Sequence, residues 1–254
     1  MIRPGLCSVT LRSQSVDEVA RLAGECGLAA IEWGGDVHVP PGDTGAARRA
    51  RAASAAADVA VASYGSYLFA AGAPTAAESG AVLDTAMALG APNVRVWAGF
   101  GVVAGSPEYS TLVAGLSAIA ADAAARGITV GLEFHGGTPT ATVDGAVALL
   151  DEVGAANLTC YWQPPYWHGP TTPAADAAEV ATLGGRLSHL HVYEWAGPEA
   201  RRPLADGRAR WSAVLDAARA CGGERVAFLE FVAGDDPEAL RRDAGTLRDL
   251  LAPP

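Results

Sequence analysis

Residues 127–142 read GITVGLEFHGGTPTAT, and this stretch decides the fold. In its first half, large apolar residues alternate with smaller or polar ones, which is the two-residue period of a β-strand. Its overall apolar character is typical of parallel strands that are covered on both faces. The strand ends in Glu133 and His135, just before a Gly-Gly turn. A carboxylate at the end of a buried strand is costly unless it is paired or bound to a metal. The alternative is a glutamate that simply emerges into solvent.

Seven further segments repeat this pattern, and each strand is followed by a helix. The predicted strands are residues 5–11, 28–33, 58–64, 93–97, 128–132, 157–162, 186–193 and 225–231. N-cap signals mark the start of two helices, at Ser15 with Glu18 and at Thr75 with Glu78. Strand–helix units of about 30 residues, repeated eight times, predict a (β/α)8 TIM barrel that occupies residues 1–254 as a single domain.

Nothing in the sequence divides the chain into two domains. It has no linker, low-complexity run or shift in composition, and 254 residues is an ordinary length for one α/β barrel. The alternative fold is a doubly wound open sheet, which a G-x-G-x-x-G turn after the first strand would favour. Residues 6–12 contain no such turn.

Charge and apolar patterning restrict the partners of the protein. The chain carries 18 basic and 28 acidic residues, a formal net charge of −10. This argues against nucleic acid as a partner, because phosphate binding needs a basic surface. No apolar run approaches the length of a membrane span, and the N-terminus leads directly into a strand without a signal-peptide pattern. We therefore expect a cytoplasmic protein with no membrane partner.

Cysteine and lysine usage restrict the chemistry. The four cysteines contain no C-x-x-C pair, which fits free thiols in a reducing compartment. The sequence contains no lysine. Schiff-base aldolase chemistry, attachment of pyridoxal phosphate and a phosphate-loop lysine are therefore excluded.

The predicted strand ends carry residues that could hold a metal. In a barrel of this type the strand ends converge on one face, where active sites are built. Glu133, His191 and Glu230 stand out, because two carboxylates and one imidazole suit a divalent ion such as Mn²⁺, Mg²⁺, Co²⁺ or Zn²⁺. His189 shares a strand face with His191 but lies farther from the strand end. We expect it to be a hydrogen-bonded residue inside the barrel.

Five segments resemble those of the xylose isomerase-like barrels in their order and spacing. They are IEWGGDVHVP (31–40), SYGSY (63–67), LEFHGGT (132–138), HLHVYEW (189–195) and FLEF (228–231). The family includes sugar isomerases and epimerases, hydroxypyruvate isomerase, inosose dehydratase and endonuclease IV. The resemblance covers almost the whole chain. It implies a TIM barrel, one divalent metal ion as cofactor and a small sugar or polyol-type substrate.

The resemblance also implies a set of metal ligands. In the ketose 3-epimerase branch, one metal is held by Glu, Asp, His and Glu at the ends of strands five to eight. Glu133, His191 and Glu230 match three of these positions, and Gln163 stands where the family has Asp. The implied ligands are therefore these four residues, with a neutral amide oxygen in place of one carboxylate. Gln163 could instead point its amide at the substrate.

The same face carries the residues that we expect to contact the substrate. The predicted substrate-binding residues are Trp33, His38, Tyr64, Arg95, Trp97, His135, Trp162 and Arg202. The aromatic members could stack on a sugar ring or simply pack in the core. Arg95 could anchor the substrate, or it could pair with Glu32 or Glu133 inside the barrel. Arg202 or its neighbour Arg201 could replace an arginine that the epimerases carry beyond the seventh strand, because Gly197 falls near the matching position.

Together these features predict a metal-dependent isomerase or epimerase that acts on a small polyhydroxy carbonyl compound. The ion would polarise the carbonyl and stabilise an enediolate, while Glu133 and Glu230 would act in turn as catalytic base and acid. Loss of a β-hydroxyl after the same first step would instead make the protein a lyase, as in inosose dehydratase. Gln163 also leaves open a weakly catalytic sugar-binding barrel. A homo-oligomer is compatible with the sequence.

Overall fold

The strands of the computed structural model close into a parallel barrel. The structure describes residues 1–197 and 200–252. The barrel strands are β1 (Ile2–Cys7), β2 (Ala30–Gly34), β3 (Ala60–Phe69), β4 (Asn93–Trp97), β5 (Thr129–Leu132), β6 (Leu158–Trp162), β7 (Leu187–Val192) and β10 (Arg225–Leu229). Each strand pairs with its neighbours in chain order, and β10 closes the barrel against β1. The predicted TIM barrel is thereby confirmed.

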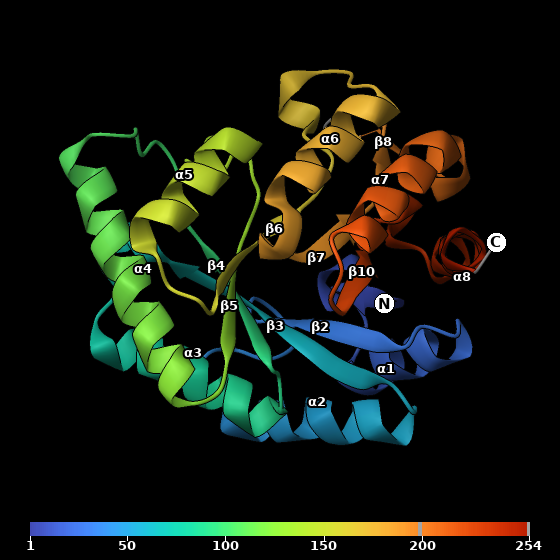
Figure 1. Cartoon of the computed structure of the whole chain (residues 1–254). Coiled ribbons are helices and arrows are strands. Elements are labelled where there is room, and N and C mark those ends of the chain that lie inside the picture. Colours follow the sequence, from blue (N-terminus) through green and yellow to red (C-terminus); the bar gives the residue numbers. More distant parts are fainter. Residues whose placement is uncertain (198–199, 253–254) are drawn as a thin grey trace.

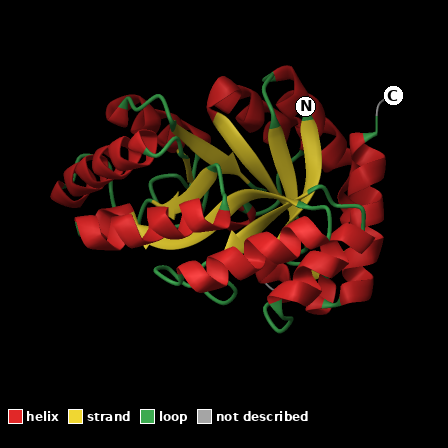
Figure 2. Cartoon of the chain, turned by 90° about the horizontal axis from the view of Figure 1, so that it is seen from below, coloured by secondary structure: helices red, strands yellow, loops and turns green. Residues whose placement is uncertain are grey.

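A ring of helices surrounds the strands (Figures 1 and 2). The helices are α1 (Val16–Glu25), α2 (Thr44–Ala56), α3 (Ala76–Leu89), α4 (Pro107–Ala125), α5 (Val143–Val153), α6 (Pro173–Leu183), α7 (Arg208–Ala220) and α8 (Pro237–Leu251). Two short strands, β8 (Glu194–Trp195) and β9 (Arg201–Arg202), pair antiparallel in the loop that follows β7. No helix in the described part of the chain is long and apolar enough to cross a membrane.

The helices begin where polar side chains satisfy their first backbone N–H groups. Ser15 accepts a hydrogen bond from the backbone N–H of Glu18 at the start of α1. Thr75 and Glu78 form the predicted reciprocal capping box at the start of α3. At α8 the cap is Asp236, and proline occupies the first turn, where its missing N–H costs nothing.

Two strands end four or more residues away from their predicted ends, and one of these differences shapes the barrel mouth. The end of the first predicted strand is a 3-10 turn at Ser8–Leu11. The third strand was expected at 58–64, but β3 continues to Phe69 with a register shift against β4. The hydroxyl of Ser66 donates to the backbone oxygen of Arg95 at 2.6 Å and holds this extension in place. Tyr67 and Phe69 are thereby carried towards the rim of the barrel.

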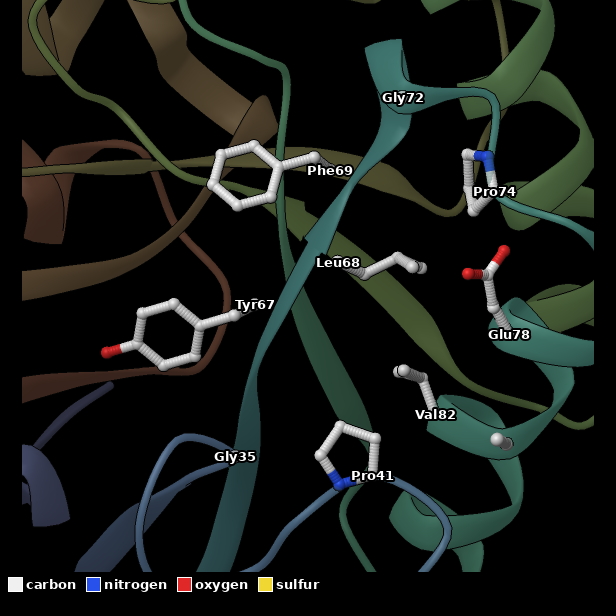
Figure 3. Close-up of a pocket in the computed structure, with 10 residues that line it drawn as sticks. Gly35, Pro41, Tyr67, Leu68, Phe69, Gly72, Pro74, Glu78 and Val82 are labelled. Atoms are coloured by element: carbon white, nitrogen blue, oxygen red, sulfur yellow. The ribbon is translucent and has the colours of Figure 1, made fainter.

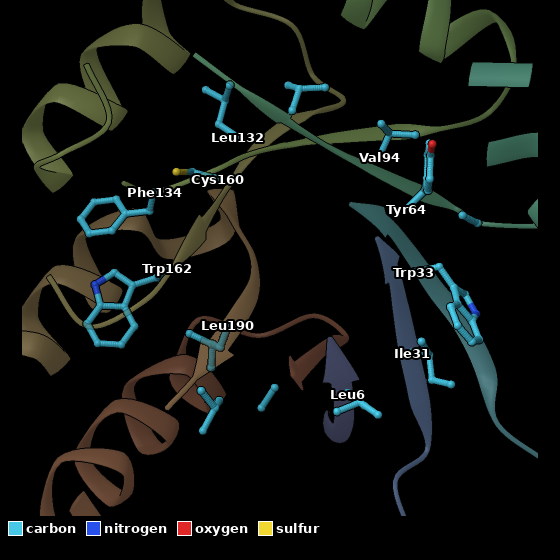
Figure 4. Close-up of a cluster of buried hydrophobic side chains, with 14 of the residues drawn as sticks. Leu6, Ile31, Trp33, Tyr64, Val94, Leu132, Phe134, Cys160, Trp162 and Leu190 are labelled. Atoms are coloured by element: carbon cyan, nitrogen blue, oxygen red, sulfur yellow. The ribbon is translucent and has the colours of Figure 1, made fainter. Parts of the chain in front are cut away.

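Apolar side chains fill the layer between the strands and the helices. Figure 4 shows part of this cluster, which includes Leu6, Ile31, Val94, Leu132 and Leu190, all fully buried. The four cysteines are free, as predicted. The apolar layer fixes the strands, and the strands in turn fix the polar side chains that point into the barrel.

Candidate active site

The ends of β5, β7 and β10 bring two carboxylates to one imidazole. Nδ1 of His191 lies 3.6 Å from Oε1 of Glu133 and 3.4 Å from Oε2 of Glu230. Both glutamates follow their strands by one residue, but their backbone N–H groups continue the barrel ladder by donating to Val96 and Val192. All three side chains are buried. The structure thus brings together three of the four predicted metal ligands.

Two atoms of this cluster lack the partner that buried polar groups normally have. Among the described residues, Nδ1 of His191 and Oε2 of Glu230 make no hydrogen bond. Gln163, the fourth predicted ligand, is buried as well, and its Nε2 donates to the backbone oxygen of Phe134 at 2.5 Å. The amide oxygen of Gln163 is therefore the end that could reach an ion. A buried donor set of this chemistry fits a divalent cation.

A second layer of charge lies deeper in the barrel. The guanidinium of Arg95 bridges two carboxylates, with Nε 2.9 Å from Oε1 of Glu32 and a terminal nitrogen 2.5 Å from Oε2 of Glu133. The hydroxyl of Tyr161 donates to the other oxygen of Glu32 at 2.7 Å. Gly65 makes room for the pair, because a Cβ there would lie 2.7 Å from the Arg95 guanidinium. Of the alternatives for Arg95, the structure shows the ion pair with both glutamates.

The surroundings shift the three titrating groups in different directions. Burial opposes ionisation of Glu133, but the charges of Arg95 and His191 outweigh it and hold the pKa of this carboxyl below its usual range. Burial raises the pKa of Glu230 to about 7. Burial alone would lower the pKa of His191, yet Glu230 and Glu133 raise it to about 10. The two carboxyl groups therefore differ in their readiness to accept and to donate a proton.

A tighter group of potential ligands lies beneath the first, but it does not suit a cation. Donor atoms of Cys7, Glu32 and His191 lie within 4.8 Å of one another. The positive charge of Arg95 already neutralises Glu32 there. Burial also raises the pKa of the Cys7 thiol, whereas a metal needs the thiolate. We assign no metal to this group.

Aromatic side chains surround the mouth of the barrel above the carboxylates. The ring centroids of Trp97 and His135 lie 4.8 Å apart, and the rings of Tyr67 and Trp97 stack with their centroids 6.5 Å apart. His135 also stacks on Trp167 at 5.6 Å, and its Nε2 lies 3.5 Å from the hydroxyl of Tyr166. Trp97 and His135 thus lie where the sequence analysis placed them. Tyr67, at the end of the SYGSY segment, also lies near a strand end as the sequence indicates, and the β3 extension carries its ring to Trp97.

Three predicted substrate contacts lie outside the barrel interior. Trp33, Tyr64 and Trp162 are fully buried in the layer beneath the helices (Figure 4). The indole of Trp33 donates to Ser54 on α2, and that of Trp162 donates to Glu179 on α6. The hydroxyl of Tyr64 donates to a backbone oxygen at 2.8 Å. Their positions do not suit substrate binding, and we correct this part of the prediction.

The remaining two predicted contacts have different surroundings. His38 is buried, and its ring nitrogens lie 3.0 Å from the hydroxyl of Ser8 and 3.2 Å from the backbone oxygen of Gln14. Both nitrogens are therefore engaged within the protein. Arg202 is exposed and lines a pocket of about 370 Å³ between the loops after β6 and β7. Arg201 instead pairs with Asp235, so Arg202 is the member of the pair that faces this pocket.

A larger pocket of about 550 Å³ lies beside the barrel mouth, between the β3 extension and α3. In Figure 3, Leu68 points towards Glu78 and Val82 of α3, whereas Tyr67 and Phe69 point to the opposite side of the strand. None of the predicted metal ligands lines this pocket. Tyr67 and Phe69 also line it, and both rings lie beside Trp97, so the β3 extension lies between this pocket and the aromatic mouth of the barrel.

The sequence matches the model of the xylose isomerase-like TIM barrel over residues 20–250, and the chain belongs to this family. Among similar solved structures is the probable 3-DHS dehydratase AsbF from Bacillus anthracis, with 19% identity, coverage of 97% of this chain and 98% of that chain, and a TM-score of 0.79. An L-ribulose 3-epimerase matches with 16% identity, 98% and 94% coverage, and a TM-score of 0.72.

A D-psicose 3-epimerase from Clostridium cellulolyticum H10 matches with 15% identity, coverage of 97% of each chain, and a TM-score of 0.73. A search of curated proteins found no match. At these identities the likeness establishes the shared barrel fold. The reaction has to be argued from the residues of this chain.

Proposed function

We propose that the protein is a divalent-metal-dependent enzyme that isomerises or epimerises a small polyhydroxy carbonyl compound by proton transfer. The observation that carries the proposal is the convergence of Glu133 and Glu230 on Nδ1 of His191, where two buried atoms have no hydrogen-bond partner within residues 1–197 and 200–252. The amide oxygen of Gln163 would complete a set of four ligands. The ion would be Mn²⁺, Mg²⁺, Co²⁺ or Zn²⁺.

The charges of the barrel interior support a divalent cation. Glu32, Glu133 and Glu230 carry three negative charges when ionised, and Arg95 carries one positive charge. With His191 neutral, two positive charges are needed to balance the cluster. A buried cluster with unbalanced charge is unfavourable, so a divalent ion matches what the interior lacks.

The two carboxyl groups suit opposite roles in proton transfer. A divalent ion at these ligands would polarise a carbonyl group and make the hydrogen on the adjacent carbon acidic. Glu133 stays ionised at neutral pH because its pKa lies below the usual range, and it would take this proton. Glu230, whose pKa is about 7, is partly protonated there and would return one. Return to the opposite face of the same carbon gives an epimer, and return to the neighbouring carbon gives an isomer.

The aromatic mouth supports a ring or a short carbon chain as the part of the substrate that packs above the carboxylates. Trp97 and His135 are the two predicted contacts that face this mouth, and aromatic faces pack well against the C–H groups of sugars and related rings. The 3-epimerases among the similar structures are named for reactions of this kind.

A lyase is the second candidate. The same first proton transfer could be followed by loss of a β-hydroxyl, and Glu230 in its protonated form could deliver the proton that departing hydroxide needs. The probable dehydratase among the similar structures is named for such a loss of water.

Hydrogen exchange with solvent tests the proposal without knowledge of the product. The protein, stripped with a chelator and reloaded with Mn²⁺, would be incubated with candidate ketoses and cyclic keto-polyols in D₂O. We expect deuterium at the carbon next to the carbonyl group, dependent on Mn²⁺ and lost in Glu133→Gln. Asp176→Asn, which changes a buried acid outside the barrel, should retain the exchange.

The outcomes separate the candidates. A product lighter by one water identifies the lyase. Turnover that retains the original hydrogen completely contradicts proton transfer. Binding of metal and sugar with no exchange for any candidate identifies the weakly catalytic sugar-binding barrel.

A further inference from the structure

One fully buried carboxylate, Glu32, lies outside the proposed ligand set and yet connects two of its members. Its Oε1 lies 3.3 Å from Nε2 of His191 and 2.9 Å from Nε of Arg95. Arg95 reaches Oε2 of Glu133 with a terminal nitrogen at 2.5 Å. Glu32 thus touches one proposed ligand directly and a second one through the arginine.

We propose, on the basis of the metal site proposed above, that Glu32 is a positioning residue for the metal centre. It accepts the Nε2–H hydrogen bond of His191, so that Nδ1 is the atom presented to the ion. Through Arg95 it also sets which oxygen of Glu133 faces the ion.

The first half of the proposal follows from the chemistry of imidazole. A neutral imidazole has one N–H group and one lone pair, and the partner of one nitrogen decides which atom carries which. A carboxylate only accepts, so Glu32 places the N–H of His191 on Nε2 and the lone pair on Nδ1. Nδ1 is also the nitrogen that faces Glu133 and Glu230. Metal-bound histidines commonly use their second nitrogen in this way.

The second half follows from the way Arg95 divides the two oxygens of Glu133. Oε2 is engaged by the guanidinium, whereas Oε1 lies nearer to Nδ1 of His191, at 3.6 Å. Since the guanidinium holds Oε2, only Oε1 is free for an ion. Glu133 should therefore bind through one oxygen.

Glu32 is itself held too firmly to move into the ligand set. Its Oε2 accepts a hydrogen bond from Tyr161 at 2.7 Å, and that hydroxyl lies 2.8 Å from Ser63 and 2.9 Å from the amide of Asn93. Its Oε1 is shared by Arg95 and His191. With both oxygens engaged, Glu32 orients the ligands and does not bind the ion.

Metal affinity in the absence of substrate tests the proposal. Mn²⁺ would be titrated into stripped protein in competition with a chelating dye. Outer-shell partners of metal ligands contribute roughly 10- to 100-fold to affinity, and we expect a loss of this size in Glu32→Gln. Tyr161→Phe removes only the hydroxyl that anchors Glu32 and should cause a smaller loss. It serves as the second variant if Glu32→Gln does not fold.

Two matched controls lie outside the barrel interior and should keep the wild-type affinity. Asp176→Asn changes a fully buried acid that pairs with Arg210 at 2.8 Å, much as Glu32 pairs with Arg95. Tyr109→Phe removes a tyrosine hydroxyl that contacts a glutamate, as Tyr161 does.

Nuclear magnetic resonance of ¹⁵N-histidine-labelled protein loaded with Zn²⁺ separates the positioning role of Glu32 from a merely structural one, because it reports on each nitrogen of His191. We expect His191 to bind Zn²⁺ through Nδ1 and to show a protected Nε2–H proton, which shifts upfield in Glu32→Gln because an amide oxygen is a weaker acceptor than a carboxylate.

The outcomes distinguish this proposal from the function on which it rests. Wild-type protein that binds no ion contradicts the proposed function. If the wild type binds an ion while Glu32→Gln and Tyr161→Phe keep affinities within about twofold of it, the role of Glu32 is overturned, since such a change is under 0.5 kcal/mol, roughly. Wild-type protein in which His191 binds Zn²⁺ through Nε2 also overturns the role of Glu32, and this outcome needs no variant.

Discussion

Nδ1 of His191 lies 3.4 Å from Oε2 of Glu230, and both atoms are buried without a hydrogen-bond partner among the described residues. The pKa of His191 is about 10, because the surrounding carboxylates outweigh the effect of burial. In the ion-free protein at pH 7 the imidazole therefore carries an extra proton. A cation that binds Nδ1 has to displace it.

We accordingly expect metal binding to release protons and to strengthen as the pH rises. One proton is displaced from His191 above pH 7, which corresponds to about a tenfold gain in affinity per pH unit. Below pH 7 Glu230 is protonated as well, and the dependence should become steeper. Calorimetric titrations in buffers of different ionisation enthalpy count the released protons. An affinity that is constant between pH 6 and pH 8 would contradict the ligand role of His191.

Glu230→Gln should weaken metal binding and stabilise the ion-free protein. Folding raises the pKa of Glu230 from 4.5 to about 7, so the folded protein holds this proton more tightly than the unfolded chain. The stability of the ion-free protein therefore falls as the pH rises from about 4.5 to about 7, and it stays lower above this window, where the buried carboxylate is ionised. We expect the variant to be more stable by ~1–3 kcal/mol at pH 8 and close to the wild type at pH 5. Urea unfolding after chelation measures both. If the variant gains less stability over the wild type at pH 8 than at pH 5, the raised pKa of Glu230 is contradicted.

His189 should matter for folding and not for metal binding. Its Nδ1 accepts the backbone N–H of Val226 at 3.1 Å, which confirms the hydrogen-bonded barrel position expected from the sequence. His189→Ala leaves that donor without an acceptor and should cost ~1–3 kcal/mol. Affinity for Mn²⁺ should stay close to that of the wild type, and a large loss would show that His189 supports the metal site.

The same histidine gives a second signature in its pH dependence. Burial lowers the pKa of His189 from 6.5 to about 4. Between these values the unfolded chain takes up a proton that the folded protein does not, so stability falls as the pH drops through this window. His189→Ala lacks this contribution. The stability advantage of the wild type should therefore be largest near pH 7 and shrink towards pH 4, as urea titrations at several pH values would show.

Strand parity explains which site residues could be predicted. The barrel fold and the three converging ligands follow from strand ends, because these meet on one face whatever the packing. Proximity to a strand end alone misplaced Trp33 and Trp162. Glu32 and Tyr161 point inwards, and successive side chains of a strand point to opposite faces, so the tryptophans that follow them point outwards. Strand parity applied to the sequence could therefore have predicted that Trp33 and Trp162 point away from the barrel interior.

Other features depend on contacts that no local pattern encodes. The extension of β3 depends on the hydrogen bond from Ser66 to the backbone of Arg95, and the bridge from Arg95 to Glu32 and Glu133 depends on the register of three strands. The cytoplasmic localisation and a homo-oligomer remain predictions, since neither follows from the fold.

Replacing one tryptophan inside the helix layer and one at the barrel mouth should separate stability from substrate binding. Trp162→Phe removes the hydrogen bond to Glu179 and leaves a cavity, at a cost of ~1–3 kcal/mol, with KM close to that of the wild type. Trp97→Ala should raise KM and cost less stability, because this ring is partly exposed at the mouth. Thermal unfolding and steady-state kinetics measure the two effects. If KM rises in Trp162→Phe and not in Trp97→Ala, Trp162 binds substrate as predicted from the sequence.

Gln163 decides how the metal is held, and changing its charge tests that assignment. Gln163→Asp restores the carboxylate of the epimerase pattern, and Gln163→Glu adds the same charge at the original length. Because hard cations favour anionic oxygen, metal affinity should rise in at least one of them, by about tenfold or more. Both lose the amide that donates to the backbone of Phe134, so the ion-free variants should be less stable by ~1 kcal/mol. Catalysis need not improve, since a site with less positive charge polarises a carbonyl group less.

If Gln163 contacts the substrate instead, both variants would keep the wild-type metal affinity and raise KM. Titration of metal into the stripped proteins separates the two roles, and equal affinities would rule out Gln163 as a ligand.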